Sequence, residues 1–191
     1  MPNGIRPTQD KVRKAIFDIL GDIEGLSFLE LFAGSGAIGL EAASRGVKEV
    51  VLVEYNRDCQ LAIEKNIASL KARACFLYPK EAESAIMRLC KEGRIFDIIF
   101  LDPPYDKVTF LKPGDKSDKG GLARDVEGHC ASLAKKTLQT LVAYDILAAG
   151  GFLIIEHFKK DDLPSTLGEL ILWKHARYGD TVVSFYRKGL T

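Results

Sequence analysis

The sequence predicts an α/β fold of the doubly wound type, built on one mostly parallel sheet. Short apolar runs alternate with segments of helical periodicity, an order that produces right-handed crossovers and a parallel sheet with helices on both faces. A glycine-rich turn joins the first apolar run to the helix after it. Two strand-like segments flank Tyr178-Gly179-Asp180, which indicates an antiparallel hairpin at the end of the sheet.

The expected elements follow one another without an interdomain linker. Seven strands are expected, at 27–32, 49–54, 74–78, 96–101, 152–156, 169–177 and 181–187. Helices are expected between an N-cap at Thr8 and Gly21, after the glycine turn, and at 59–70, 82–91 and about 132–147. The polar segment at about 106–128 is rich in helix and strand breakers, and we expect a mobile loop there. We therefore expect a single domain over 1–191 with this loop inserted.

Composition limits where the protein works and what it binds. No apolar run approaches the roughly 18 residues of a membrane span, and the N-terminus lacks the apolar core of a signal peptide, so we expect a cytoplasmic protein. The four cysteines and three histidines are scattered, which argues against disulfides and against a metal site. A formal charge of +1 confines any nucleic-acid surface to a local patch. We expect a monomer.

The glycine-rich turn predicts a cofactor site. Gly34-Ser35-Gly36-Ala37-Ile38-Gly39 matches G-x-G-x-x-G directly after a strand and at the start of a helix. Glycines lack a Cβ atom and let the backbone approach a bound molecule closely. We expect Phe32, Gly34, Ser35 and Gly36 to contact a nucleotide-like ligand. A tight turn without a ligand is the alternative.

Two acidic residues narrow the choice of cofactor. Glu54 ends the second strand, where a carboxylate can accept hydrogen bonds from both hydroxyls of a ribose; this suits NAD and S-adenosyl-L-methionine equally. We expect Tyr55 beside it to contact the cofactor too. Glu30 lies inside the apolar first strand and needs a partner such as the ammonium of a methionyl group. Glu30 therefore favours S-adenosyl-L-methionine, although a bond to local backbone or to an arginine is the alternative.

The most specific motif is Asp102-Pro103-Pro104-Tyr105, at the carboxyl end of the fourth strand, where ligands bind in open α/β sheets. Two prolines make the loop stiff and remove two backbone donors. Asp102 and the carbonyl of Pro103 could hold the amino group of a nucleobase in line with a methyl donor and stabilise the developing positive charge. Pro104 and Tyr105 would contact the flipped base. Separately, these residues could be a turn, a strand terminator and a core aromatic.

With these motifs in view, the chain resembles the RsmD-type ribosomal RNA methyltransferases of bacteria. The motifs that carry the resemblance are Arg6-Pro7-Thr8, Val12-Arg13, Phe17, Leu31–Gly36, Asp102–Tyr105 and Tyr178–Thr181. The resemblance implies a Rossmann-like class I methyltransferase fold with S-adenosyl-L-methionine as cofactor. It also implies methylation of the N2 amino group of one guanine in small-subunit ribosomal RNA, so that this RNA or the small subunit is the partner.

The resemblance also assigns roles to individual residues. It implies cofactor contacts from Glu30, Gly34, Gly36, Glu54 and, at the adenine edge, Glu81; guanine contacts from Asp102 and Tyr105; and a shaping role for Arg6 and Thr8 on the substrate side. Among the basic residues near the site, we expect Arg13 to meet RNA phosphates. A solvated helix face is the alternative for Lys11, Lys14, Lys107 and Lys112.

Three other functions compete with this interpretation. A DNA adenine-N6 or cytosine-N4 methyltransferase shares both motifs but usually carries a target-recognition domain, for which this chain has little room. An NAD-dependent oxidoreductase would use the glycine turn but leaves Asp102–Tyr105 unexplained. A non-catalytic RNA-binding protein with this fold would have no need of the intact Asp102–Tyr105 motif.

Overall fold

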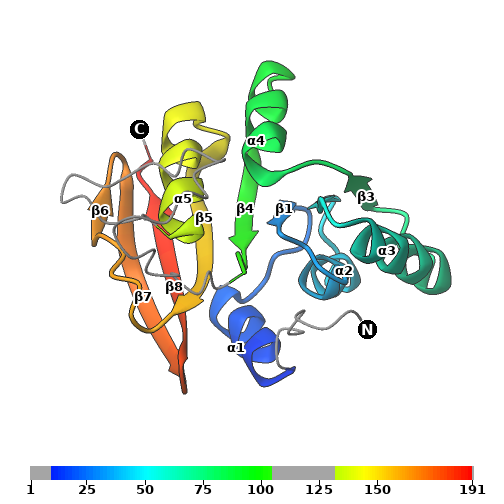
Figure 1. Cartoon of the computed structure of the whole chain (residues 1–191), viewed down its shortest axis with the longest axis horizontal. Coiled ribbons are helices and arrows are strands. Elements are labelled where there is room, and N and C mark those ends of the chain that lie inside the picture. Colours follow the sequence, from blue (N-terminus) through cyan, green and yellow to red (C-terminus); the bar gives the residue numbers. More distant parts are fainter. Residues whose placement is uncertain (1–9, 105–131, 191) are drawn as a thin grey trace, which may run out of the picture.

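The computed structural model describes residues 10–104 and 132–190, and the strands in these ranges form one sheet (Figure 1). The strands are β1 (Ser27–Leu31), β2 (Glu49–Val53), β3 (Cys75–Tyr78), β4 (Phe96–Leu101), β5 (Leu147–Phe158), β6 (Thr166–Leu167), β7 (Leu170–Tyr178) and β8 (Thr181–Lys188). Their order in the sheet is β3-β2-β1-β4-β5-β8-β7-β6. Strands β1 to β5 pair in parallel and the last three are antiparallel, which confirms the predicted sheet and hairpin.

Helices cover both faces of the sheet, as a doubly wound fold requires. They are α1 (Asp10–Leu20), α2 (Ala37–Ser44), α3 (Arg57–Leu70), α4 (Ala82–Lys91) and α5 (Leu133–Tyr144). Residues of α1, α2 and α3 share one core with Phe28, Phe100 and Ile154, whereas α4 and α5 share the other with Leu29 and Leu101. Successive strand residues point to opposite faces, so each buried strand supplies both cores.

The register ends four neighbouring strands at one level. Leu31, the last residue of β1, pairs with Val53 on one side and with Leu101 on the other. Val53 in turn pairs with Tyr78, the last residue of β3. The loops that follow β1, β2, β3 and β4 therefore leave the sheet along one edge.

The one substantial difference from the predicted elements lies between α5 and β5. We expected a helix to about 147 and a strand beginning after Gly150-Gly151, but the helix ends at Tyr144 and β5 begins at Leu147. The two glycines do not end the strand but lie in a bulge of β5. Phe96 pairs with Leu147 and Ile98 with Phe152, so the register with β4 shifts across the glycines, and Gly150 has a φ of 71°. A glycine pair inside a strand can mark a bulge as well as an end.

Within the described residues the sheet has eight strands, where the sequence predicted seven. The additional strand, β6, has only two residues, which is too short for a periodic pattern to reveal. The predicted loop at about 106–128 lies outside the described residues, as do Arg6, Thr8 and Tyr105. Within the described ranges, none of the helices has the length and apolar character needed to cross a membrane. The cytoplasmic location and the single domain over 1–191 stay predictions.

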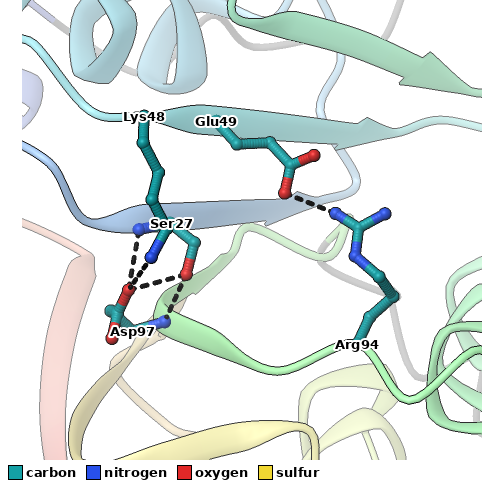
Figure 2. A network of polar contacts seen from close by, with 5 residues as sticks. All are labelled: Ser27, Lys48, Glu49, Arg94 and Asp97. Carbon is teal, nitrogen blue, oxygen red and sulfur yellow. Dashed lines mark hydrogen bonds and ion pairs between the residues drawn. The ribbon is translucent and has the colours of Figure 1, made fainter.

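A polar network ties together the amino ends of the central strands, opposite the edge described above (Figure 2). The amide and hydroxyl of Ser27 donate to Asp97 Oδ2 over 2.8 and 2.7 Å, and the amide of Asp97 donates back to the hydroxyl over 3.0 Å. Lys48 Nζ lies 3.5 Å from the same carboxylate oxygen. Arg94 pairs with Glu49 nearby. These contacts join β1 to β4 across 70 residues of chain.

The network sets the ionisation of Asp97. Partial burial opposes the charge, but hydrogen bonds from Ser27 and the nearby ammonium of Lys48 outweigh it and hold the pKa of Asp97 below its usual value. Because the folded-state pKa is the lower one, the stabilisation is present above the unfolded pKa of about 3.9. It is lost as the pH falls through the folded pKa.

We predict that Asp97→Asn lowers the free energy of unfolding by about 1–2 kcal/mol at pH 7, because a charged acceptor of two hydrogen bonds is replaced by a neutral amide. The loss should shrink towards pH 3. Urea unfolding of both proteins at pH 7 and pH 3 measures it, with Asp18→Asn as a control at an exposed carboxylate of α1. An equal loss at both pH values would show that the charge of Asp97 is irrelevant.

Candidate cofactor and substrate site

Three of the predicted site residues lie at the edge where β1 to β4 end. Phe32, Glu54 and Asp102 each come directly after the last residue of β1, β2 and β4, and these last residues are paired with one another. Adjacent strands lie about 4.8 Å apart, so the three loops begin as near neighbours. The sheet thereby brings together residues that are up to 70 positions apart in the chain.

The turn after β1 is built from left-handed backbone. Phe32, Gly34 and Gly36 have φ values of 60°, 56° and 74°. This conformation is easy for glycine, but for a residue such as Phe32 it costs about 1–2 kcal/mol. The chain can thus reverse between β1 and α2 and present the turn at the sheet edge. Strain of this kind at a non-glycine residue is typical of functional sites.

Gly39 lets α2 approach the sheet closely. A Cβ atom on Gly39 would lie 2.4 Å from Leu52 Cδ2 and 2.8 Å from both Val50 Cγ1 and Glu30 Oε2. A side chain at this position would force these buried neighbours to shift, so the third glycine of the motif serves helix–strand packing. The structure thereby assigns the motif two separate physical tasks, a reversal at Gly34 and Gly36 and a close contact at Gly39.

Glu30 is buried beneath the start of α2. Its side chain is 3% exposed, and Oε2 accepts a hydrogen bond from the amide of Gly39 over 2.8 Å. Burial raises the pKa of Glu30 to about 8; the backbone hydrogen bonds from Gly39 and Ile38 oppose that shift, and the charge of Glu54 adds to it. A bond to local backbone, the alternative that the sequence left open, is therefore present. An ammonium partner for Glu30 stays a prediction.

Glu54 joins the loop after β1 to the loop after β2. Its Oε2 accepts from the amide of Gly34 over 2.8 Å, and its Oε1 accepts from the amide of Asn56 over 2.7 Å. The side chain is 9% exposed, so these bonds are largely screened from water. Both loops are consequently held in place before any ligand arrives.

Two side chains of α3 complete this arrangement and were not anticipated. Gln60 Nε2 donates to the carbonyls of Glu54 and Tyr55, each over 3.0 Å, and Asn66 Nδ2 donates to the carbonyl of Ser35 over 3.0 Å. A signal existed in the sequence, because both lie on the helix face that also carries Ile63. A polar residue on the apolar face of a helix needs a partner inside the protein.

The loop after β4 presents the residues expected to act on a substrate. Asp102 is half-buried, Pro103 is buried and Pro104 is exposed, whereas Tyr105 is outside the described residues. Pro103 thus anchors the loop against the protein. On the cofactor side, Tyr55 is 69% exposed and Glu81 is exposed directly before α4. These two residues leave their side chains accessible at the same edge of the sheet.

Arg13 belongs to a helix and not to one of the loops that follow the strands. It lies on α1, where its guanidinium pairs with Asp10 one turn earlier over 2.9 Å. Lys11 and Lys14 are exposed on the same helix. An RNA-binding role for Arg13 stays a prediction, since a solvated helix face accounts for this ion pair equally well.

Sequence reasoning did not single out Glu156, which the structure places next to the candidate site. It lies on β5 directly after Ile155, the partner of Leu101, and is therefore level with Asp102. Its side chain is only 7% exposed. The signal was available, because Glu156 ends the apolar run of β5 much as Glu30 interrupts that of β1.

A cavity of about 240 Å³ lies elsewhere, between α5 and the strands β5 and β7. Its lining includes Leu141, Val142, Leu153 and Leu170, with Lys188 and Glu169 at its polar side. None of the predicted site residues contributes to it, so it is not a candidate for the cofactor or substrate site.

Residues 1–114 match the family model described as Conserved hypothetical protein 95. YlbH of Bacillus subtilis, named as an rRNA methyltransferase, is 32% identical over 186 residues, or 96% of this chain and 88% of that protein. Ribosomal RNA small subunit methyltransferase D of Escherichia coli K12 is 40% identical over 147 residues, 73% and 70% of the two chains. The solved structure of yhhF from Escherichia coli, titled as a methyltransferase, has a TM-score of 0.75 and 25% identity, covering 100% of this chain and 92% of its own.

The environment of Glu30 predicts a pH dependence of stability. The folded carboxyl group keeps its proton up to about pH 8, whereas the unfolded one loses it near 4.5. Between these values the stability of the wild type should fall as the pH rises, by at most about 1.4 kcal/mol per pH unit. The glutamine of Glu30→Gln does not titrate and can still accept a hydrogen bond from the amide of Gly39. The free energy of unfolding of this variant should therefore rise relative to that of the wild type between pH 5 and pH 8.

Urea unfolding of both proteins at pH 5 and pH 8 provides the measurement. Glu30→Leu is the matched variant: it should lose about 1–3 kcal/mol at pH 5, because the buried amide of Gly39 then has no acceptor. If Glu30→Gln and the wild type differ by the same amount at both pH values, Glu30 is already ionised at pH 5.

Proposed function

The chain belongs to the RsmD-type family of ribosomal RNA methyltransferases, and on that premise we propose that it methylates the N2 amino group of a guanine in small-subunit ribosomal RNA, with S-adenosyl-L-methionine as methyl donor. One observation carries the proposal. The glycine turn, Glu54 and the Asp102-Pro103-Pro104 loop follow strands that end at the same level. A cofactor on the first two would therefore lie beside a substrate on the third.

The residues after β1 and β2 fit this cofactor. Gly34 and Gly36 carry no side chains, so the turn leaves space for close backbone contact. The two oxygens of Glu54 each accept one amide hydrogen bond, and a carboxylate oxygen has a second lone pair with which to accept a ribose hydroxyl. Phe32, Ser35, Tyr55 and Glu81 would line the remainder. Once bound, S-adenosyl-L-methionine supplies an electrophilic methyl group on a sulfonium ion.

The loop after β4 would orient the base. The lone pair of an exocyclic amino group is delocalised into the ring, so attack depends on alignment and on stabilising the positive charge that develops on nitrogen. Asp102 and the carbonyl of Pro103 would each accept one N–H of the N2 group. These two hydrogen bonds would align the nitrogen with the methyl group and stabilise the positive charge. The two prolines keep these acceptors in position because they restrict the backbone.

The substrate side of the proposal extends beyond these acceptors. Tyr105 and Pro104 would contact the flipped base, while Arg6, Thr8 and Arg13 would meet the RNA around it. The partner is then ribosomal RNA or the small ribosomal subunit, acted on by a monomer in the cytoplasm.

Transfer of labelled methyl from S-adenosyl-L-methionine tests the proposal directly. The acceptors are ribosomal RNA, small subunits and DNA from cells that lack the enzyme, and mass spectrometry identifies the modified base. We expect N2-methylguanine in small-subunit RNA. Modification of adenine N6 or cytosine N4, or of DNA, would replace the substrate that we propose.

Asp102→Ala should separate chemistry from cofactor binding. We expect the rate of methyl transfer to fall about 10²–10³-fold, as for the loss of one preorganised electrostatic contact in other enzymes. The dissociation constant for S-adenosyl-L-methionine, measured by calorimetry, and the melting temperature should stay near the wild-type values. Asp162→Ala, at an exposed residue, is the control. Full activity of Asp102→Ala would contradict the assigned role.

A further inference from the structure

Glu156 lies beside the loop expected to hold the substrate. In the parallel pairing of β4 with β5, Leu101 is the partner of Ile155, so the next residues along the two strands are Asp102 and Glu156. Parallel strands are about 4.8 Å apart. The two carboxylates therefore occupy neighbouring positions near the carboxyl edge of the sheet, although they are 54 positions apart in the chain.

The side chain of Glu156 is buried without a complete set of partners. It is 7% exposed, and Oε2 is the one buried side-chain oxygen or nitrogen in the described ranges that has no hydrogen-bond partner. Burial raises the pKa of this carboxyl group to about 7. Burying an unpartnered carboxylate is costly for a fold. A buried group without a partner requires an explanation, and a ligand that supplies the missing partner is one.

The direction of the side chain points to the same conclusion. Ile154 packs in the core that contains α1 and α2, and Ile155 packs in the opposite core. By the alternation of a strand, Glu156 lies on the face of Ile154, which is also the face of Phe100. Glu30 is on this face too, since its partner in β4 is Phe100. Glu156 is thus on the same side of the sheet as α2, which the glycine turn leads into.

We propose that Glu156 is a specificity-determining residue that accepts the N1–H of the target guanine while Asp102 and Pro103 hold the N2 amino group. The inference rests on the proposed function and names how that site selects its base. Guanine presents an N1–H donor next to its N2 amino group, so two acceptors on neighbouring strands match that edge: Asp102, directly after β4, and Glu156, within β5. Adenine has an unprotonated N1, whose lone pair would face the ionised carboxylate and be rejected, so the discrimination should be strongest above pH 7, where Glu156 is ionised.

An analogue of guanine tests this contact. 2,6-Diaminopurine carries the same N2 amino group, but its N1 is an acceptor and not a donor, and an amino group replaces O6. The change at position 6 affects the wild type and the variant alike, so the difference between the two proteins reports the contact with N1. We would place guanine or 2,6-diaminopurine at the methylated position of small-subunit RNA and measure kcat/KM for the wild type and for Glu156→Gln. Glutamine keeps the size of the side chain, replaces the charged acceptor by a weaker neutral one and adds an NH₂ donor. Glu64→Gln, at an exposed position of α3, is the matched control.

We expect the wild type and Glu64→Gln to prefer guanine at least tenfold. Glu156→Gln should lose at least tenfold in kcat/KM on guanine, and its preference should shrink or invert because its amide can donate to N1 of the analogue. Its melting temperature and its dissociation constant for S-adenosyl-L-methionine should match those of the wild type. A merely structural role would not change the preference between the two bases.

Other results would overturn the inference in distinguishable ways. If Glu156→Gln keeps the wild-type rate and preference, Glu156 does not read the base although the proposed function stands. If it loses cofactor affinity instead, Glu156 serves the methyl donor. Should Glu156→Gln not fold, Glu156→Leu gives the same comparison, and an unchanged preference in it would equally refute the role. If the wild type methylates no guanine N2, the proposed function fails and the inference fails with it.

Discussion

The register of β1 against β2 and β4 is the constraint on which the rest of the structure depends. It ends the strands at one level, so the glycine turn, Glu54 and Asp102 emerge side by side. A slip of one residue would turn every buried side chain of β1 to the wrong face, because strand residues alternate between faces. Apolar cores on both sides of β1 oppose that slip. The cores that stabilise the fold therefore also align the candidate site.

Buried glutamate side chains fix the loops at the carboxyl edge of the sheet. Glu54 accepts hydrogen bonds from two loop amides, and Glu30 accepts one from an amide near the start of α2. These backbone N–H groups therefore have partners, and the free-energy cost of burying them without hydrogen bonds is avoided. This leaves the loops held in place without a ligand, which reduces the ordering that binding requires. Glu156 differs, because Oε2 of this carboxylate lacks a partner within the described residues.

Much of the fold could be predicted because its signals are local. The limits of α4 and β4 match the expected ones, since their apolar periodicities are complete and end at clear breakers. The start of β5 could not be predicted in the same way. Gly150-Gly151 is compatible with a turn or with a bulge, and only the pairing with β4 selects the bulge. Strand β6 exists solely through its pairing with β7.

By itself, the sequence determined the strand–turn–helix units, the glycine turn and the Asp102-Pro103-Pro104 motif, because each depends on residues close together in the chain. Only the tertiary structure decided what the carboxylates contact: that Glu30 binds the amide of Gly39, and that Glu156 lies level with Asp102. The physical reason is that hydrogen-bond partners and burial depend on which strands become neighbours. Strand pairing joins residues far apart in sequence, and no local pattern encodes it.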